Sequence, residues 1–376
     1  MKEALRKMLG AGLLAGLLAL TAGAQAPQFS NWSGPVNLGP AINSRFNDQH
    51  PTISKDGLTL IFISDRTTPD VNGQTPFGDY DLYVSQRDTP DDPWGPPANL
   101  AVLNTPFREF APELSTDGHW LYFHSNRPGG CGLADIYAVH RKNKRDDFTW
   151  EAPINLGCIL NTPVTDAGPT VFQDPDTGVF TMYINRNYIP PPDMEGFDIY
   201  MSTCSADISS CNRDQLWTAA SIVNELSSPV RDTRTAIRRR DGLEIIVTSS
   251  RTGGCGSQDL WVSTRTTTAD AWSIPVNLDP IDPSTGKPTC VTNSSALDGA
   301  MALSWDGTEL IFFSNRPGGS GLNDLWVATR TKVKGKDDRD EQKGEHSGEG
   351  KDRDRDKDKD KEKDKDKDGD KHSRKD

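Results

Sequence analysis

The sequence predicts an all-β protein, a single five-bladed β-propeller built from four-stranded antiparallel blades. Two observations support this fold. A pattern occurs five times, in which a Trp, with Pro-x-Asn-Leu after it in four of the copies, precedes an Asn, an acid, an aromatic-rich run ending in Arg, and an Asp before apolar residues. Self-similarity at this spacing, combined with alternating strands, is typical of propellers and solenoids. Turn signals such as Asp117-Gly118 separate the alternating runs within a copy, which indicates strands joined by tight turns.

The second copy shows how one blade is expected to form. Residues 111–115, 120–124, 135–140 and 150–156 are short runs with strand character, divided by turn or loop residues. Four such strands in sequence form an antiparallel meander, which is the unit of a propeller blade. After the fifth copy no further Trp strand follows, whereas residues 32–38 precede the first copy unpaired. We therefore expect this N-terminal strand to complete the fifth blade, because ring closure removes exposed sheet edges.

The repeat resembles the TolB-like, WD-repeat-like propeller family of exported bacterial proteins. The resemblance lies in Asp117-Gly118 with the Leu-Tyr-Phe run 121–123, in the Ser-Asn-Arg run 125–127, and in the Asp-Ile-Tyr run 135–137, with their counterparts in the other copies. It covers residues 32–331. The resemblance implies a propeller fold and says little about function.

Both ends of the chain differ in composition from the repeats. Residues 1–24 read as a signal peptide, with a basic start, an apolar core too short for a stable membrane anchor, and a cleavage site after Ala24. The propeller is assigned to residues 27–331. Residues 332–376 form a Lys/Asp-rich tail with almost nothing to bury, which predicts disorder. We therefore expect a periplasmic or secreted protein with no membrane span after signal cleavage.

The folded body is predicted to be strongly acidic. The tail holds 17 basic and 17 acidic residues, so residues 25–331 carry 36 acids and 22 bases, a net charge of −14. This charge argues against a nucleic-acid partner, since no basic excess would meet the phosphates. It leaves cations, basic proteins and neutral sugars as ligands.

Six cysteines in an exported chain predict three disulfides. Strand direction alternates within a blade, so each loop can be assigned to one of two faces. We call one of them the upper face. It holds the loop that follows the Arg of each copy and the loop that leads from each Trp strand to the next inner strand. Sorting the cysteines by face and blade predicts these pairs: Cys131–Cys158, Cys204–Cys211 and Cys255–Cys290. No CxxC pair is present, so a zinc site is disfavoured.

Each blade also carries an acid at the start of its inner strand, and we call these residues the inner-strand acids. They are Asp48, Glu109, Asp166, Asp232 and Asp298. One interpretation is that they brace turns through side-chain hydrogen bonds to the backbone. The other is a carboxylate ring at the channel mouth that binds a sugar, a cationic ligand or a divalent cation such as calcium. No other cofactor is predicted.

Two further positions recur in every blade, an Arg after the second strand and an Asp at the start of the third. The repeat arginines are Arg66, Arg127, Arg186, Arg251 and Arg316, and the repeat aspartates are Asp81, Asp135, Asp198, Asp259 and Asp324. Because the two positions end and begin neighbouring strands, we expect Arg and Asp of one blade to form a structural ion pair.

Two functions from different classes fit these observations. The first is an exported binding or scaffold propeller whose partner, an envelope or extracellular protein or glycan, meets the upper face. The second is a glycoside-active enzyme that uses Asp48, Glu109 and Asp166 as acid and base or nucleophile. Against catalysis, the acid occurs in all five blades, whereas a catalytic set should be asymmetric. Among the four histidines of the body, only His50 is expected near the upper channel mouth.

Overall fold

The computed structural model describes residues 28–187 and 196–333. The predicted signal peptide and almost all of the Lys/Asp-rich tail lie outside these residues, as does residue range 188–195. Among the described residues, no helix is long and apolar enough to cross a membrane.

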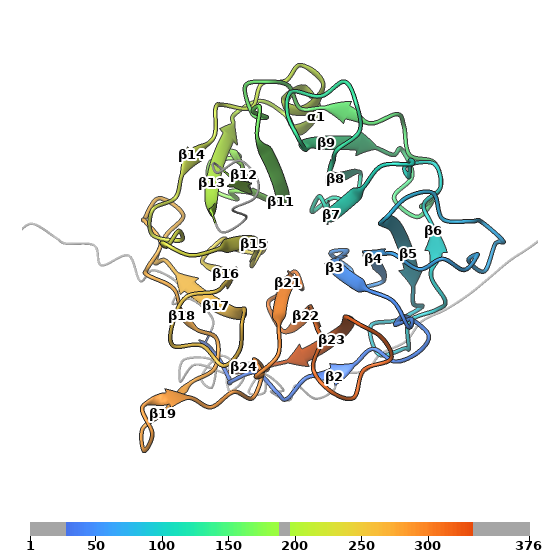
Figure 1. Ribbon diagram of the computed structural model, residues 1–376. Helices are drawn as coiled ribbons and strands as arrows, with labels where there is room; N and C mark the ends of the chain where they lie inside the picture. The colour runs from blue at the N-terminus through green and yellow to red at the C-terminus, as the bar shows by residue number, and fades with distance from the viewer. Residues whose placement is uncertain (1–27, 188–195, 334–376) are drawn as a thin grey trace, which may run out of the picture. The chain divides into compact units, whose positions relative to one another are not determined.

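Five four-stranded antiparallel sheets surround a central channel, as the sequence predicts (Figure 1). The inner strands are β3 (Asp48–Ile53), β7 (Glu109–Leu114), β11 (Thr165–Gln173), β15 (Asp232–Ile237) and β21 (Asp298–Leu303). The second strands are β4 (Thr59–Ser64), β8 (Trp120–Ser125), β12 (Phe180–Asn187), β16 (Glu244–Ser249) and β22 (Glu309–Ser314). The third strands are β5 (Asp81–Gln86), β9 (Asp135–His140), β13 (Phe197–Cys204), β17 (Asp259–Thr264) and β23 (Asp324–Thr329). The outer strands are β6 (Ala98–Asn99), β10 (Ile154–Asn155), β14 (Ser221–Ile222), β18 (Val276–Asn277) and β2 (Val36–Asn37).

The N-terminal strand closes the ring, which confirms the prediction. Strand β2 pairs antiparallel with β23, so that Val36 is opposite Val327 and Asn37 is opposite Trp326. A second pairing, between β1 (Gln28–Phe29) and β24 (Lys332–Val333), was not predicted and joins the two ends of the propeller again. The fifth blade therefore combines residues from both ends of the described chain.

The core lies between adjacent blades, where the apolar faces of neighbouring sheets pack together. One cluster joins the first two blades through residues such as Ile61, Val84, Leu121 and Phe123, all less than 5% exposed. Burial of these residues provides the main driving force for blade-to-blade packing.

The Trp residues of the outer segments are packing anchors, and four of them support an Arg. The guanidinium carbon lies 4.2 to 4.4 Å from the Trp ring centroid in these pairs: Arg87–Trp94, Arg141–Trp150, Arg265–Trp272 and Arg330–Trp32. At this distance the face of the Trp ring attracts the positively charged guanidinium group. The third blade replaces this pair with a short helix, α1 (Ile208–Arg213), capped by Asp207, and Trp217 donates its indole N–H to Asn212.

All three predicted disulfides are present: Cys131–Cys158, Cys204–Cys211 and Cys255–Cys290. The second joins β13 to helix α1, which the sequence analysis did not predict. The third holds the segment that carries a small hairpin, β19 (Ile281–Asp282) with β20 (Lys287–Pro288), which projects from the ring in Figure 1. Three disulfides are consistent with an oxidising compartment outside the cytoplasm.

Candidate functional site

Every inner strand is interrupted by a bulge two residues after its acid. The pairing register shifts at this point in all five blades. The residues at these points have positive φ angles and are called the bulge residues: His50, Ala111, Gly168, Arg234 and Ala300. Four of the five have a Cβ atom, and a non-glycine residue in this backbone region is strained. Bulges of this kind redirect side chains and often occur beside binding sites.

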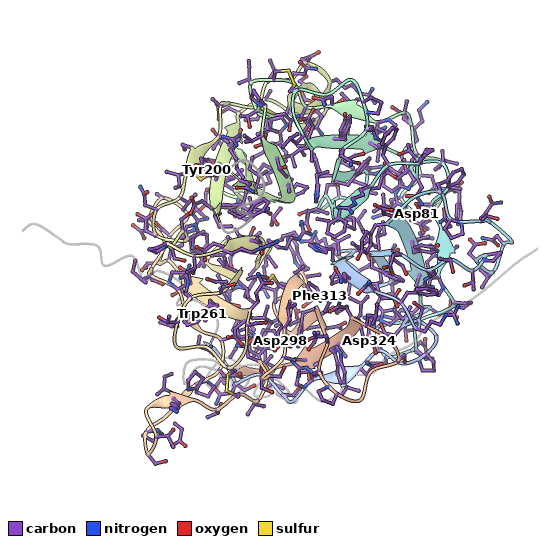
Figure 2. All side chains as sticks on the ribbon, in the orientation of Figure 1. Asp81, Tyr200, Trp261, Asp298, Phe313 and Asp324 are labelled. Atoms are coloured by element: carbon purple, nitrogen blue, oxygen red, sulfur yellow. A yellow bond between two sulfur atoms is a disulfide. The ribbon has the colours of Figure 1, made fainter. Side chains whose placement is uncertain are left out.

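The five bulge residues line one cavity at the upper end of the central channel, which we call the channel-mouth cavity. Its volume is about 790 Å³, within the range of pockets for small molecules. Besides the bulge residues, its polar lining includes Gln49, Arg108, His124, Asn126, Asn185, Arg231, Gln258 and Asn323. Its apolar lining includes Phe110, Leu133, Val164, Phe197, Leu297 and Phe313. In Figure 2, Phe313 lies toward the centre of the ring, whereas Asp81 and Trp261 lie farther out.

The charge of this cavity is opposite to that of the protein. Three arginines line it, Arg108, Arg231 and Arg234, and none of the described residues that line it is Asp or Glu. The propeller body has an excess of acids. A positively charged cavity in an acidic protein attracts anions to one place on its surface.

Arg231 is the least satisfied of these cations. Its side chain is half-buried, its guanidinium carbon lies 5.2 Å from the centroid of Phe197, and its Nε atom is buried without a hydrogen-bond partner. Among the described residues it forms no ion pair; Arg108, in contrast, is paired with Asp79 on the surface. Burial lowers the pKa of Arg231, because desolvation without a carboxylate disfavours the charged form.

The floor of the cavity is a buried ionic group that spans the channel. Arg234 of β15 reaches the second blade, where its Nη2 donates to the carbonyl of Pro112 at 2.8 Å and to Glu113 at 3.2 Å. Arg239 donates to the carbonyls of Leu114 and Ile53, each at 2.7 Å. These two arginines of the fourth blade therefore connect strands of the first two blades across the channel axis.

Glu113 forms ion pairs with both arginines: its Oε2 is 3.2 Å from Nη2 of Arg234, and its Oε1 is 3.8 Å from Nη1 of Arg239. Burial raises the pKa of Glu113, and the two arginines oppose this change. A carboxylate in this position compensates two buried cations, so the group is a structural feature of the channel.

Both histidines in the cavity are neutral near pH 7. Burial, the nearby Arg234 and the neighbouring His124 hold the pKa of His50 well below its ordinary value. Burial, Arg234 and Arg108 lower the pKa of His124 to about 3. The expectation that only His50 lies at the channel mouth is wrong: His124 of β8 also lines the cavity, and it is opposite Phe110, directly before the bulge of the second inner strand.

The inner-strand acids do not line the cavity. Each is fully buried and forms an ion pair with the repeat Arg of its own blade: Asp48–Arg66 at 2.5 Å, Glu109–Arg127 at 2.8 Å, Asp166–Arg186 at 2.5 Å, Asp232–Arg251 at 2.7 Å and Asp298–Arg316 at 2.5 Å. Each also accepts hydrogen bonds from the backbone and hydroxyl of a Ser or Thr four residues earlier. The geometry is that of a turn brace.

The predicted ion pairs between repeat arginines and repeat aspartates are therefore wrong. The pairs do not form for Arg66 with Asp81, Arg127 with Asp135, Arg186 with Asp198, Arg251 with Asp259, or Arg316 with Asp324. Each Arg turns toward the inner strand, where the acid and a backbone carbonyl both accept its protons.

Four of the repeat aspartates bind loop backbone instead. Each carboxylate accepts hydrogen bonds from the backbone N–H groups three and four residues earlier, in the upper loop. These residues are Asp81, Asp135, Asp259 and Asp324. In the third blade, burial and the nearby Asp232 raise the pKa of Asp198. These carboxylates order the loops that surround the cavity.

Sequence reasoning missed the residues that give the cavity its charge, Arg108, Arg231 and Arg234. The available signal was the variation next to a repeated residue. The residue two positions after the acid is His, Ala, Gly, Arg and Ala in the five blades. The residue directly before the acid is Asn, Arg, Thr, Arg and Leu. No group of three or more His, Cys, Asp or Glu suited to a metal ion occurs in the described parts of the chain.

The sequence matches no protein-family model and no curated protein. Similar solved structures include an α-L-arabinofuranosidase from Lactobacillus brevis, with 15% identity, a TM-score of 0.48, and coverage of 80% of this chain and 94% of that one. The catalytic domain of a Coprinopsis cinerea family 62 α-L-arabinofuranosidase has 13% identity and a TM-score of 0.48, over 81% and 98%. A thermostable family 43 glycoside hydrolase has 12% identity and a TM-score of 0.49, over 80% and 94%. The likeness concerns the propeller fold alone, and the resemblance to the TolB-like family stays a prediction.

Proposed function

We propose that this protein is an exported binding propeller whose channel-mouth cavity holds a small ligand that bears an anionic group. The observation that carries the proposal is Arg231, a half-buried guanidinium without an ion-pair partner among the described residues, in a cavity whose described lining contains no carboxylate. Desolvating a cation without a partner is unfavourable. An anion at this position would compensate that loss, and hydrogen bonds to charged groups are among the stronger ones.

Glycoside hydrolysis is the alternative, and it requires two carboxyl groups beside the scissile bond. The three candidates, Asp48, Glu109 and Asp166, are fully buried and hydrogen-bonded to their own blades. Fold similarity does not decide activity. The cavity geometry therefore supports a binder better than an enzyme with these three residues as its catalytic groups.

Two matched ligand pairs test the proposal: benzoate against benzamide, and galacturonate against galactose. We expect isothermal titration of the full-length, disulfide-intact protein to show at least tenfold tighter binding of the anion in at least one pair. Arg231→Gln should remove that preference, since a charged hydrogen bond contributes about 1.5–3 kcal/mol. Arg145→Gln, at an exposed arginine outside the cavity, is the control and should change nothing.

Equal affinity for the charged and neutral members of both pairs would overturn the anion-binding proposal. Hydrolysis of nitrophenyl α-L-arabinofuranoside by the wild-type protein, lost in Glu109→Gln while the fold is retained, would support the glycoside-active alternative instead. The two assays use the same purified protein, so a binding result and a turnover result can be compared directly.

A further inference from the structure

The channel-mouth cavity has an aromatic side that its cations do not explain. His50 and Phe110 form an edge-to-face pair with centroids 4.4 Å apart, and Phe313 is stacked against His50 at 5.8 Å. His124 lies 5.4 Å from Phe110 on the other side. These four rings line the cavity without interruption from the fifth blade through the first to the second. We call them the aromatic wall.

The aromatic wall is apolar in character although two of its members are histidines. Both imidazoles are neutral at physiological pH because burial and the nearby Arg234 lower their pKa. Neutral rings in edge-to-face and stacked contact offer flat surfaces to another ring. The imidazole ring of His50 contacts the rings of Phe110 and Phe313, and its buried Nδ1 atom has no hydrogen-bond partner among the described residues.

The other side of the cavity has a different composition. Arg231 precedes β15 in the fourth blade, and Phe197 beneath its guanidinium group begins β13 in the third. Asn185 of the third blade lines the cavity near them. Blades three and four close the ring opposite blades five, one and two, as the inner strands in Figure 1 show. Arg231 and the aromatic wall therefore line the cavity from different blades.

We propose that the ligand is amphipathic: a flat, apolar body that packs against the aromatic wall and a single anionic group that pairs with Arg231. The inference rests on the proposed function, because it places the anionic group at the same arginine. It adds that charge alone is insufficient and that a ring system provides much of the affinity. Neutral sugars and compact inorganic anions fit only one of the two sides.

A series of carboxylates with growing ring systems tests this inference. Acetate, benzoate and naphthoate share the anionic group and differ in apolar area. In displacement titrations at constant ionic strength, we expect affinity to rise roughly tenfold with each ring added, since each buries further apolar surface. Naphthamide, which keeps the rings and lacks the charge, should bind more weakly than naphthoate.

Two variants separate the two sides of the cavity. Phe110→Leu keeps an apolar side chain but removes a ring, and it should weaken naphthoate binding severalfold while leaving acetate unchanged. Arg231→Gln should weaken both carboxylates. Phe77→Leu, at an exposed phenylalanine in the upper loop of the first blade, is the matched control and should leave all affinities unchanged.

The outcomes distinguish the inference from the function on which it rests. If anions bind with a preference over their neutral counterparts but acetate, benzoate and naphthoate bind equally, the amphipathic ligand is refuted and anion binding survives. If naphthoate and naphthamide bind equally, the cavity recognises rings and not charge, and the pairing with Arg231 is wrong. If no member of the series binds, both proposals fail.

Discussion

Substitution of one inner-strand acid separates its structural role from a ligand-binding role. Asp232 is fully buried; its Oδ1 accepts from Arg251 at 2.7 Å, and its Oδ2 accepts from the backbone and hydroxyl of Ser228, each at 2.6 Å. In Asp232→Asn one oxygen becomes an NH₂ group. Whichever way the amide turns, at least one donor then faces another donor, and the positive charge of Arg251 loses its partner.

The expected loss of stability follows from this geometry. The side chain of Arg251 is only 13% exposed and that of Asp232 is 0% exposed, so solvent screening weakens the pair very little. Removing one partner of a buried ion pair costs about 3–5 kcal/mol. We expect the free energy of unfolding to fall by that amount. For a domain of this size, the melting temperature should fall by roughly 2 °C per kcal/mol, or about 6–10 °C.

Urea unfolding, followed by tryptophan fluorescence and circular dichroism, measures this loss. Asp88→Asn, at an exposed aspartate of the first blade, is the control and should change stability by less than about 0.5 kcal/mol. The double variant Asp232→Asn/Arg251→Met should be less destabilised than the sum of its parts, because the unpaired charge is also removed.

The turn-brace role would be refuted by a small structural effect. If Asp232→Asn lowers stability by less than about 1 kcal/mol and yet abolishes binding of an anion or a cation, the carboxylate acts on a ligand. Unchanged stability together with unchanged binding would show that the five-fold repetition of this acid has another origin.

Three further predictions concern the channel and the disulfides. His124 has a pKa of about 3 in the fold, whereas its ordinary value in the unfolded chain is 6.5. Between these two pH values the unfolded state binds more protons than the folded state, so the free energy of unfolding falls as pH drops below 6.5. The loss by pH 5 is about 2 kcal/mol. Urea midpoints of His124→Gln should depend less on pH in this window, and identical slopes would contradict the assignment. Glu113→Gln should lower the unfolding free energy by about 3–5 kcal/mol, because Arg234 and Arg239 lose their carboxylate partner. Adding Arg239→Met should recover part of this loss, and calorimetry can measure both changes. Replacing Cys255 and Cys290, which are separated by 35 residues, with Ser should lower the unfolding free energy by about 4 kcal/mol. Replacing the third-blade pair, with a separation of 7, should lower it by about 2 kcal/mol, because a disulfide that closes a longer loop removes more entropy from the unfolded chain. Equal losses in unfolding titrations would show that loop entropy does not determine the difference.

The repeat made much of the fold predictable. Five copies of one pattern specify five blades, and the unpaired segment 32–38 specifies the closing strand. The disulfides followed from the same geometry, because knowing the face of each loop leaves few neighbours for each cysteine. Helix α1 was missed because it replaces the Arg–Trp stack in only one blade, and a single exception has no periodic signal.

The ion pairs were mispredicted because sequence spacing does not give side-chain direction. Asp135 begins β9, as expected, and is opposite Ser125 at the end of β8. However, Arg127 lies two residues beyond its strand, where its Nε donates to Ser125 and its Nη2 reaches Glu109 and a carbonyl. Asp135 is closer to the free N–H groups of the upper loop. Each of the two side chains therefore hydrogen-bonds to other groups.

The same repeat explains why the site was harder to find than the fold. A residue present in all five blades performs a task that every blade shares, and the inner-strand acids show this by bracing every inner strand in the same way. The cavity is lined by positions beside those acids, where each blade contributes a different side chain. Repeated positions therefore specify the ring, and the neighbouring variable positions supply the arginines and the aromatic rings that line its centre. In a propeller of this kind, the ligand should be inferred from how the blades differ around the channel.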